Sequence, residues 1–413
     1  MSDKQIFAAL EIADHEVRLI VSELHNLKFN VLKVERVEIA GIDKLRIVDE
    51  QNVISGIKKA VMNAEKMIGA SIQRVLLVVP SLDFSRLAKR ITVALDNNRI
   101  SIKDIQKALM AAMSSPLQDN KELVNFGTIR YIVNGFVTRR LPVNEKAESL
   151  AVEVDLLAAN KDMVWEYVKC VEKADLEIID IYLDTYAFSS EAALFERAIG
   201  HYVLAIRYEQ NSTTLTLLAN GRIESSMVLN RGFGKIVDQI VVTSGLPVDI
   251  ASKLLLHNCR LKGKVDTSPI YLWSHDNKTY TINEKEMVDI VGPLIDEWIE
   301  EIRSISQEIL ANVDILCVLY GEGSQILQLN EILSAKLDHK FSVYIPETLG
   351  IRDSTLATCA GLFYCYRDQE LFRGKNLYSI NSDEFEKMIN AHKVTEVSEK
   401  EETLTNRFKK LFK

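Results

Sequence analysis

Two glycine turns are the parts of this chain best suited to chemistry. Gly321 and Gly323 follow an apolar run and open an expected helix, and Gly232 and Gly234 stand before another expected helix. Glycine lets the backbone approach a phosphate closely, so a turn between a strand and a helix is a candidate phosphate contact. Such a turn also needs glycine for purely structural reasons, and Glu322 adds a negative charge to the first one.

No set of catalytic side chains is evident elsewhere. The seven histidines do not group with serine or cysteine as a nucleophile and its base would, and neither an H-E-x-x-H nor a P-loop signature occurs. The cysteines are scattered and show no zinc-binding spacing or disulfide framework: Cys170, Cys259, Cys317, Cys359 and Cys365. We therefore expect no catalytic residue, no metal site and a reducing cytosol.

Length and composition limit the classes of protein. The 413 residues suffice for two large lobes or several subdomains, and 47% hydrophobic with 26% charged residues is ordinary for a soluble globular protein. The net charge of −8 argues against nucleic-acid binding. The N-terminus lacks the pattern of a signal peptide, and no run of about 18 apolar residues predicts a membrane span.

The last eleven residues, 403–413, form the only dense basic cluster of the chain. As a helix they place four apolar side chains on one face and four basic ones on the rest: Leu404, Phe408, Leu411 and Phe412, and Arg407, Lys409, Lys410 and Lys413. This pattern is typical of a helix lying in a membrane interface, although a helix docked on the protein's own core would share it. The acidic, polar stretch 382–402 predicts a flexible linker and favours a membrane anchor.

The elements that must position the glycine turns repeat along the chain. Strands are expected at 5–10, 16–24 and 30–39, followed by a helix that ends at Gly69 and a buried strand at 74–79. Three strands between 202 and 229 and a later one at 314–319 repeat this opening. We therefore predict a duplicated α/β architecture. A helix at 102–113 between strand-like segments indicates a small α+β unit embedded in the first lobe.

The order of these elements resembles the actin-like ATPase superfamily, and more specifically FtsA, the bacterial family that links the FtsZ division ring to the membrane. Residues 9–23 (ALEIADHEVRLIVSE) fall where FtsA has its first phosphate loop, and 41–67 resemble its "G-x-D-K-G-x-V-x-D" stretch. VLYGEGSQILQLNEIL at 318–333 looks like the adenosine motif, STLATCAGLFYCY at 354–366 like the helix after it, and TNRFKKLFK at 405–413 like the membrane-targeting helix.

The resemblance implies a two-lobed actin-like fold with an inserted small α+β subdomain, the SHS2 domain, in the first lobe. The implied boundaries are the first lobe at 1–84 and 166–200, the inserted subdomain at 85–165, the second lobe with its partner-binding outer subdomain at 201–349, closing helices at 350–381, the linker at 382–402 and the membrane helix at 403–413.

The phosphate loops depart from the family pattern. Actin-like loops use Asp-x-Gly-Thr/Ser, in which glycine admits the phosphate and the hydroxyl donates to it. In the first loop Ala13 replaces the glycine, and Asp14 puts a carboxylate where an anion should bind. A protonated His15 would offset that charge, but an exposed turn histidine is the simpler interpretation. The second loop, 207–214, has no glycine, and Arg207, a phosphate ligand or a surface residue, replaces an aspartate.

For the family, ATP or ADP with magnesium is the expected cofactor. The resemblance places nucleotide contacts at Glu11, Ala13, Asp14, Ser212, Thr213, Gly232, Gly234, Gly321 and Gly323. Because both phosphate loops are damaged, we predict weak or absent nucleotide binding and no hydrolysis, which makes the chain a pseudo-ATPase.

The implied function is a cell-division scaffold that self-assembles as a filament and tethers the FtsZ ring to the membrane through 403–413. Its expected partners are the C-terminal peptide of FtsZ, further copies of itself and anionic lipid, and its expected location is the cytoplasmic face of the membrane at the division site. The peptide site is expected among the helices of 248–310, with Trp298 in the core.

Three alternatives share the superfamily. A PilM-like type IV pilus assembly protein has the same fold and inserted subdomain but lacks the basic tail. A sugar kinase is disfavoured by the damaged phosphate loops, and a DnaK-like chaperone is disfavoured because no substrate domain follows the actin-like core.

Overall fold

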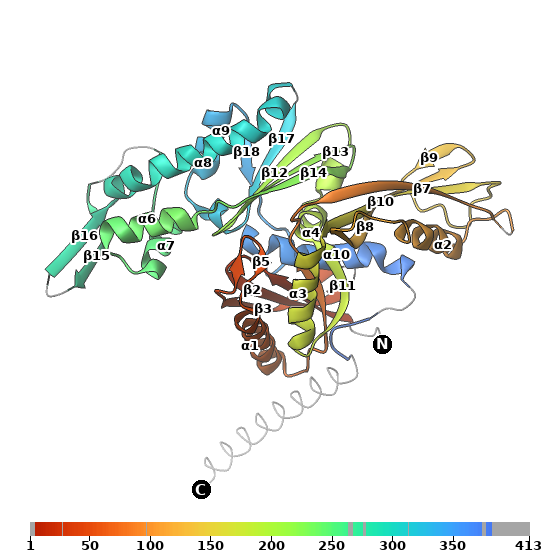
Figure 1. Ribbon diagram of the computed structural model, residues 1–413, viewed down its shortest axis with the longest axis horizontal. Coiled ribbons are helices and arrows are strands. Elements are labelled where there is room, and N and C mark those ends of the chain that lie inside the picture. Colours follow the sequence, from red (N-terminus) through yellow and green to blue (C-terminus); the bar gives the residue numbers. More distant parts are fainter. Residues whose placement is uncertain are drawn as a thin grey trace, which may run out of the picture.

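The computed structural model describes residues 5–381 except 27, 96, 263–266, 276–277, 313 and 374–376. The expected linker at 382–402 and the expected membrane helix at 403–413 therefore lie outside the described residues. Two five-stranded sheets form the centres of two lobes, and a four-stranded sheet extends from their junction (Figure 1).

The first sheet has the strand order β11-β6-β1-β2-β3. Its strands are β1 (Gln5–Ile12), β2 (Glu16–His25), β3 (Lys28–Glu38), β6 (Arg74–Val79) and β11 (Glu177–Leu183). The first three are antiparallel neighbours, whereas β6 joins β1 and β11 joins β6 in parallel. Burial on both faces explains why β1 and β6 are nearly continuous apolar runs.

Alternate residues of β1 pack into hydrophobic cores on opposite faces of the sheet. Ile6 and Leu10 pack with α1 (Glu50–Ile68) and α3 (Lys161–Lys173), and Phe7 packs with α10 (Ala357–Gln369) on the opposite face. As predicted, α1 ends at Gly69, whose φ of 75° is left-handed. The segment after α10 returns to the same sheet, because the Ala8 amide donates to Ser379 Oγ at 2.7 Å.

The second sheet repeats the first. Its order is β14-β13-β12-β17-β18, again with an antiparallel meander followed by two parallel neighbours. The strands are β12 (Tyr202–Tyr208), β13 (Thr213–Ala219), β14 (Arg222–Leu229), β17 (Ile315–Tyr320) and β18 (Phe341–Val343). The predicted duplication of an α/β lobe is confirmed.

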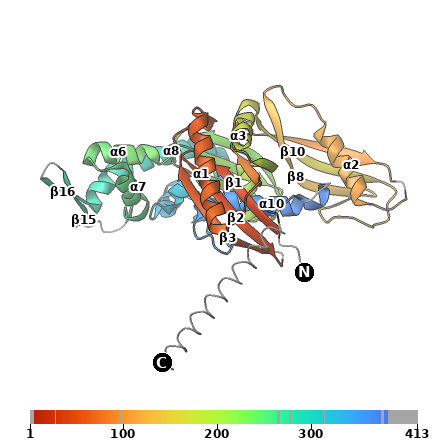
Figure 2. The ribbon, with the colours of Figure 1, turned by 90° about the horizontal axis from the view of Figure 1, so that it is seen from below.

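The helices of the second lobe extend away from the inserted sheet (Figures 1 and 2). They are α6 (Gly234–Ser244), α7 (Val248–His257), α8 (Glu284–Asn312) and α9 (Leu329–Leu337), with a hairpin of β15 (Pro269–His275) and β16 (Lys278–Asn283). Among the described residues no single helix has the length and apolarity of a membrane span; only α6 and α7 as a pair do, with a bend of 118°.

One predicted helix, at 324–337, is wrong at its start. A 3₁₀ turn (Glu322–Gln325) comes first, and Gln328 with a φ of 64° separates it from α9. The Ser324 hydroxyl donates to the Gly321 carbonyl oxygen at 2.7 Å, which holds the chain in the tight turn.

The inserted sheet has the order β7-β10-β8-β9. Its strands are β7 (Ser85–Val93), β8 (Lys121–Val133), β9 (Phe136–Thr138) and β10 (Leu150–Asn160). The predicted helix α2 (Ile102–Met113) begins at a capping box between Ser101 and Asp104 and covers one face of this sheet. Two short helices, α4 (Asp184–Glu191) and α5 (Leu194–Arg197), pack on the second lobe's sheet.

Candidate functional site

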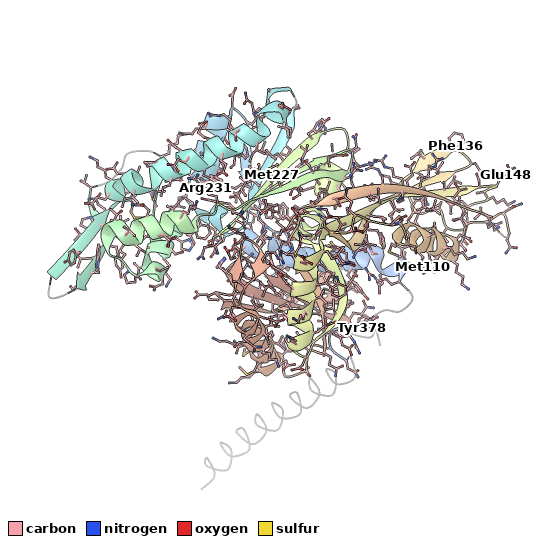
Figure 3. All side chains as sticks on the ribbon, in the orientation of Figure 1. Met110, Phe136, Glu148, Met227, Arg231 and Tyr378 are labelled. Atoms are coloured by element: carbon pink, nitrogen blue, oxygen red, sulfur yellow. The ribbon has the colours of Figure 1, made fainter. Side chains whose placement is uncertain are left out.

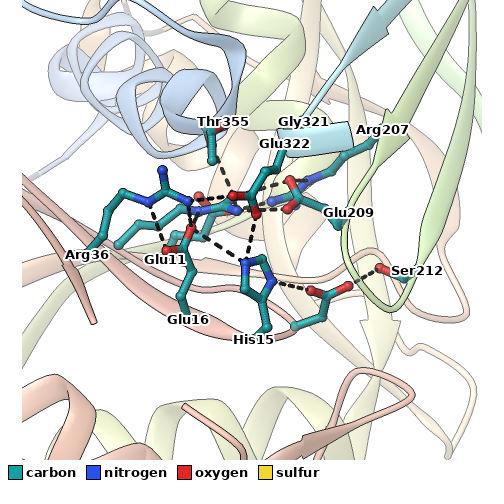
Figure 4. Close-up of polar contacts among 12 residues, drawn as sticks. Glu11, His15, Glu16, Arg36, Arg207, Glu209, Ser212, Gly321, Glu322 and Thr355 are labelled. Carbon is teal, nitrogen blue, oxygen red and sulfur yellow. Dashed lines mark hydrogen bonds and ion pairs between the residues drawn. The ribbon is translucent and has the colours of Figure 1, made fainter. Parts of the chain in front are cut away.

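Three turns from the two lobes meet between the sheets (Figure 4). The β1–β2 turn brings Asp14 and His15, the β12–β13 turn brings Glu209 and Ser212, and the turn after β17 brings Glu322. Because β1 and β12 open equivalent meanders, the duplication places these turns face to face. The structure thus brings the sequence-predicted loops together, and charged side chains fill the space between them.

Arg207 crosses from the second lobe into the first. Its guanidinium forms an ion pair with Glu11 and lies 3.2 Å from Asp184 Oδ2 and 3.1 Å from Glu209 Oε1. The side chain is only 9% exposed, so it is not the surface residue that the sequence allowed. Nor is it free to bind a phosphate, because three carboxylates already surround it.

Arg18 makes the reciprocal crossing from β2. It donates to Glu16 at 2.5 Å, to Glu209 Oε2 at 2.7 Å and to the Thr355 carbonyl oxygen at 3.0 Å, with no exposed surface. Burial alone would raise the pKa of Glu209, but Arg18 and Arg207 outweigh it and hold that pKa well below its usual range. Glu209 therefore stays ionised between two guanidinium groups.

His15 links the β1–β2 turn of the first lobe to the turn after β17 in the second. Its Nδ1 lies 2.8 Å from Asp14 Oδ1, and its Nε2 lies 2.8 Å from Glu322 Oε2. Burial lowers the pKa of His15, but the two carboxylates outweigh burial and raise it to about 10. The expectation of an exposed turn histidine is wrong, because this side chain is 13% exposed and paired on both nitrogens.

Asp14 completes the connection between the lobes. Its Oδ2 accepts a hydrogen bond from the Ser212 hydroxyl at 2.8 Å and another from the Asn211 amide at 2.9 Å. Arg36 adds an outer layer, with 2.8 Å to Glu16 and 3.1 Å to Glu322. The hydroxyl that would serve a phosphate instead binds a carboxylate of the same protein.

The charges at this site do not suit an anion. Six carboxylates meet three arginines and one protonated histidine, an excess of two negative charges when all six are ionised and of one when Glu11 is protonated: Glu11, Asp14, Glu16, Asp184, Glu209 and Glu322 against Arg18, Arg36, Arg207 and His15. Burial raises the pKa of Glu11 despite Arg207 and Arg18, and its Oε2 has no hydrogen-bond partner. A phosphate here would meet a net negative field.

Two sets of three side chains at the site could hold a metal ion. The first set is Asp14, His15 and Glu209, and the second is His15, Glu16 and Glu322. Both depend on His15, whose two nitrogens already face carboxylates and whose raised pKa keeps it protonated. Because a protonated imidazole does not ligate a metal, a metal at either set would have to displace the proton from His15.

The space left between the loops is too small for a nucleotide. The cavity has a volume of about 20 Å³, whereas small-molecule sites occupy about 300–1,000 Å³. It is lined by Glu11, Ala13, Asp14 and Ser212 of the predicted contacts, together with Arg207, Glu209 and Asp184. The residues present therefore do not fit the phosphates and magnesium that the fold family implies.

The predicted glycines are explained by packing of one loop on another. A Cβ added to Gly232 would lie 2.3 Å from the Gln210 carbonyl oxygen, and one added to Gly234 would lie 2.7 Å from the same atom. Gly321 has a φ of +88°, and a Cβ on Gly323 would meet the Tyr208 ring at 2.4 Å. These turns pack so closely against the second loop, 207–214, that only glycine fits.

Thr213 and Trp298 belong to the interior of the second lobe. The Thr213 hydroxyl donates to the Arg231 carbonyl oxygen at 2.6 Å and accepts from the Trp298 indole at 3.0 Å. Trp298 is fully buried and stacks on Tyr208 with ring centroids 4.0 Å apart, which confirms that it is a core residue.

Sequence reasoning missed Arg18, Glu16, Arg36, Asp184 and Glu209. One signal was available, because Arg18 and Arg207 each interrupt an otherwise apolar buried strand (EVRLIVSE and VLAIRYE). A charge in such a strand needs a buried partner. Arg18 is paired with Glu209, which follows β12, and Arg207 with Glu11 near the end of β1, so each partner comes from the other lobe.

No protein-family model matches the chain. It is similar to the cell division protein FtsA of Bacillus subtilis, 25% identical over 373 residues that cover 88% of this chain and 83% of the relative. FtsA of Streptococcus pneumoniae is 23% identical over 374 residues, covering 86% and 79%.

Among solved structures, the PilM–PilN type IV pilus biogenesis complex gives a TM-score of 0.56 at 15% identity, covering 86% of this chain and 97% of that one. The ethanolamine utilization protein EutJ from Carboxydothermus hydrogenoformans gives 0.50 at 10% identity, covering 86% and 88%. These neighbours show the actin-like ATPase fold, as predicted. The collinear similarity to several FtsA proteins supports the predicted membership of the FtsA family.

Proposed function

We propose that this chain is a cell-division scaffold that assembles on the membrane without an ATP cycle. The ion-pair network between the lobes is the observation that supports the absence of an ATP cycle. Arg18 with Glu209, Arg207 with Glu11, and His15 with Glu322 join the first lobe to the second across the position of a nucleotide. In this chain, side chains replace the ligand that would otherwise connect the lobes.

Opening this cleft for a nucleotide would be costly. A ligand that displaced one partner of a buried ion pair and left the other charge buried would lose about 3–5 kcal/mol, and three ion pairs span the lobes. A ligand would have to supply that free energy in addition to entering a negatively charged space. We therefore propose a pseudo-ATPase that holds a single lobe arrangement.

Equilibrium titration with a fluorescent ATP analogue and magnesium tests this part of the proposal, together with a turnover assay on the purified chain. We expect neither saturable binding at micromolar concentration nor phosphate release above a no-protein blank. A micromolar dissociation constant would refute the proposal of a closed cleft, and turnover above the blank would refute the pseudo-ATPase.

Membrane attachment is proposed for 403–413 from its sequence pattern. Burying four Leu and Phe side chains contributes at most about 6–12 kcal/mol, and four basic residues near anionic lipid add about 1 kcal/mol each. Ordering eleven residues costs about 11–22 kcal/mol, so one anchor binds marginally. Several anchors on one polymer bind by avidity, which makes attachment depend on assembly.

Co-sedimentation with liposomes of phosphatidylglycerol and phosphatidylethanolamine tests the anchor. The full chain should pellet, a truncation ending at Glu402 should remain in solution, and Phe408→Ala should pellet less than the full chain. A conservative Leu404→Met variant is the matched control, because it retains the apolar face. Equal pelleting of the full chain and the truncation would contradict the anchor, as would pelleting of neither.

Self-assembly and partner binding are proposed for the two ends of the molecule. Phe136 and Met110 project from the inserted subdomain (Figure 3) and are 79% and 58% exposed. Val242 of α6 and Val248 of α7 are 80% and 56% exposed in the outer part of the second lobe. We place the self-contact at the first pair and the C-terminal peptide of FtsZ at the second.

Two substitutions separate these contacts. Phe136→Ser should reduce the sedimentation coefficient of assembled protein without changing peptide affinity, and Val242→Asp should weaken binding of a synthetic FtsZ C-terminal peptide without changing assembly. If either substitution changes both readouts or neither, the assignment of the two ends is wrong. The fold similarity to PilM does not by itself favour a pilus role, because it carries 15% identity, whereas the sequence relatives are division proteins.

A further inference from the structure

The inserted sheet has a charged face opposite α2. Alternation along its strands puts Val152 and Val154 of β10 in the core under α2, and therefore Glu153 on the other face. Arg90 of β7 and Arg130 of β8 pair in register with Glu153 from its two sides. This face meets the β13–β14 turn of the second lobe, where the two domains form a junction.

Two adjoining cavities of about 270 and 410 Å³ open at that junction. Both are lined by Arg130 and Arg222, the first also by Arg90 and the second also by Arg139. We call these four residues the arginine cluster. It is a concentration of positive charge in a chain whose net charge is −8.

Only part of the positive charge of the arginine cluster is paired with carboxylates. Asp155 lies 3.2 Å from Arg86 and 3.8 Å from Arg222, and Glu153 lies 3.8 Å from Arg90. In the part of the chain that the structure describes, neither Arg130 nor Arg139 forms an ion pair with a carboxylate. The cluster therefore retains two guanidinium groups outside any ion pair, and the nearest carboxylates to Arg130, Glu153 and Asp155, are those already paired with Arg90, Arg86 and Arg222.

Those two groups converge on one atom. Arg130 donates to the Asn220 carbonyl oxygen at 3.2 Å, and Arg139 donates to the same oxygen at 2.7 Å. The buried Nε of Arg130 has no hydrogen-bond partner. Gly221 permits the approach, since a Cβ there would lie 2.6 Å from Arg139 Nη1. Burial, with Arg222 and Arg139 nearby, lowers the pKa of Arg130.

We propose that the arginine cluster binds a phosphate-bearing ligand at the junction of the inserted subdomain and the second lobe. Two like charges held on one carbonyl oxygen repel each other, and an anion between them removes that repulsion. Guanidinium groups present planar N–H donors that pair with phosphate oxygens two at a time. Cavities of this size accommodate a pyrophosphate or a small phosphorylated molecule.

Because the ligand would contact both domains, it would also stabilise their junction. Thr128 of β8 already donates to the Gly221 carbonyl oxygen at 3.1 Å, and Arg86 of β7 pairs with Glu224 of β14 at 2.6 Å. These contacts hold the cluster in place without the ligand. The proposal is independent of the closed cleft and of the membrane anchor.

Calorimetric titration of the full chain with sodium pyrophosphate, in low and in moderate salt, tests the proposal. We expect saturable binding that weakens with salt. Arg130→Gln combined with Arg139→Gln should weaken it by about tenfold or more, whereas Arg140→Gln, one residue away and lining neither cavity, should bind like wild type. Circular dichroism and thermal melting of each variant establish that it is folded.

A short-chain, water-soluble phosphatidylglycerol is the second probe, because vesicles would also bind 403–413. If the double variant loses binding of this lipid while pyrophosphate does not bind wild type, the phosphate belongs to a lipid headgroup. If the double variant loses only pyrophosphate binding, the phosphate belongs to a soluble ligand. Equal behaviour of wild type and a folded double variant with both probes overturns the proposal. If the double variant does not fold, Arg139→Gln alone, on an exposed side chain, decides between these outcomes.

Discussion

His15 makes the stability of the closed cleft depend on pH above neutrality. Its pKa in the folded protein is raised from 6.5 to about 10 by Asp14 and Glu322 against the effect of burial. A group with a raised folded pKa contributes stability that is fully present below pH 6.5 and lost as pH rises through about 10. At about 1.4 kcal/mol per pKa unit, the upper bound is about 5 kcal/mol, of which about 2–3 kcal/mol falls between pH 7 and 9.

Replacing His15 with glutamine should remove this dependence. Urea unfolding of wild type and His15→Gln, followed by circular dichroism at pH 6, 7, 8 and 9, gives the difference in free energy of unfolding at each pH. That difference should be largest at pH 6 and should shrink by about 2–3 kcal/mol from pH 7 to pH 9. His257→Gln, at an exposed residue in the last turn of α7, is the matched control and should give a constant difference near zero.

A difference between wild type and His15→Gln that stays constant across this pH range would refute the reasoning. It would mean that His15 is neutral in the folded protein, so that the ion pair with Glu322 carries no charge on the imidazole. NMR titration of the His15 ring protons would check this independently, because a protonated ring should not titrate below pH 9.

Two further substitutions test the packing of the cleft. Glu209→Gln leaves two buried guanidinium groups with fewer counter-charges and should lower the free energy of unfolding by about 3–5 kcal/mol in a urea titration at pH 7. The exposed Glu300→Gln is its control and should cost at most about 1 kcal/mol. Gly323→Ala places a Cβ 2.4 Å from the Tyr208 ring and should cost about 1–3 kcal/mol, whereas Gly292→Ala in α8 meets nothing within 4 Å and should be neutral or stabilising. Equal effects within either pair would contradict the described packing.

Local sequence signals predicted the elements well where the cause lies within a few residues. The left-handed cap at Gly69 and the capping box at Ser101 are local, and the helices that they bound begin or end where expected. The duplicated lobes followed from the repeated strand and turn pattern. The break at Gln328 was missed because glutamine is not a helix-breaking residue, and nothing in the sequence indicates its left-handed φ of 64°.

The contents of the cleft could be predicted only in part. The damaged phosphate loops were visible from Ala13, Asp14 and Arg207, since these replace the residues that a phosphate needs. What fills the cleft was not visible, because Arg18 and Glu209 are 191 residues apart and nothing local relates them. A single sequence gives the charge of each residue but not the pairing of charges across the lobes.

The position of α10 has a consequence for biosynthesis. The face of the first sheet that carries Phe7 and Phe29 is covered by Phe363 and its neighbours, and the segment with Ser379 binds β1. On the ribosome, the first strands therefore emerge long before the residues that cover them. We expect the N-terminal half to keep an aggregation-prone apolar surface until residues 357–379 have been synthesised, so that the lobe begun first is completed only after the second has been made.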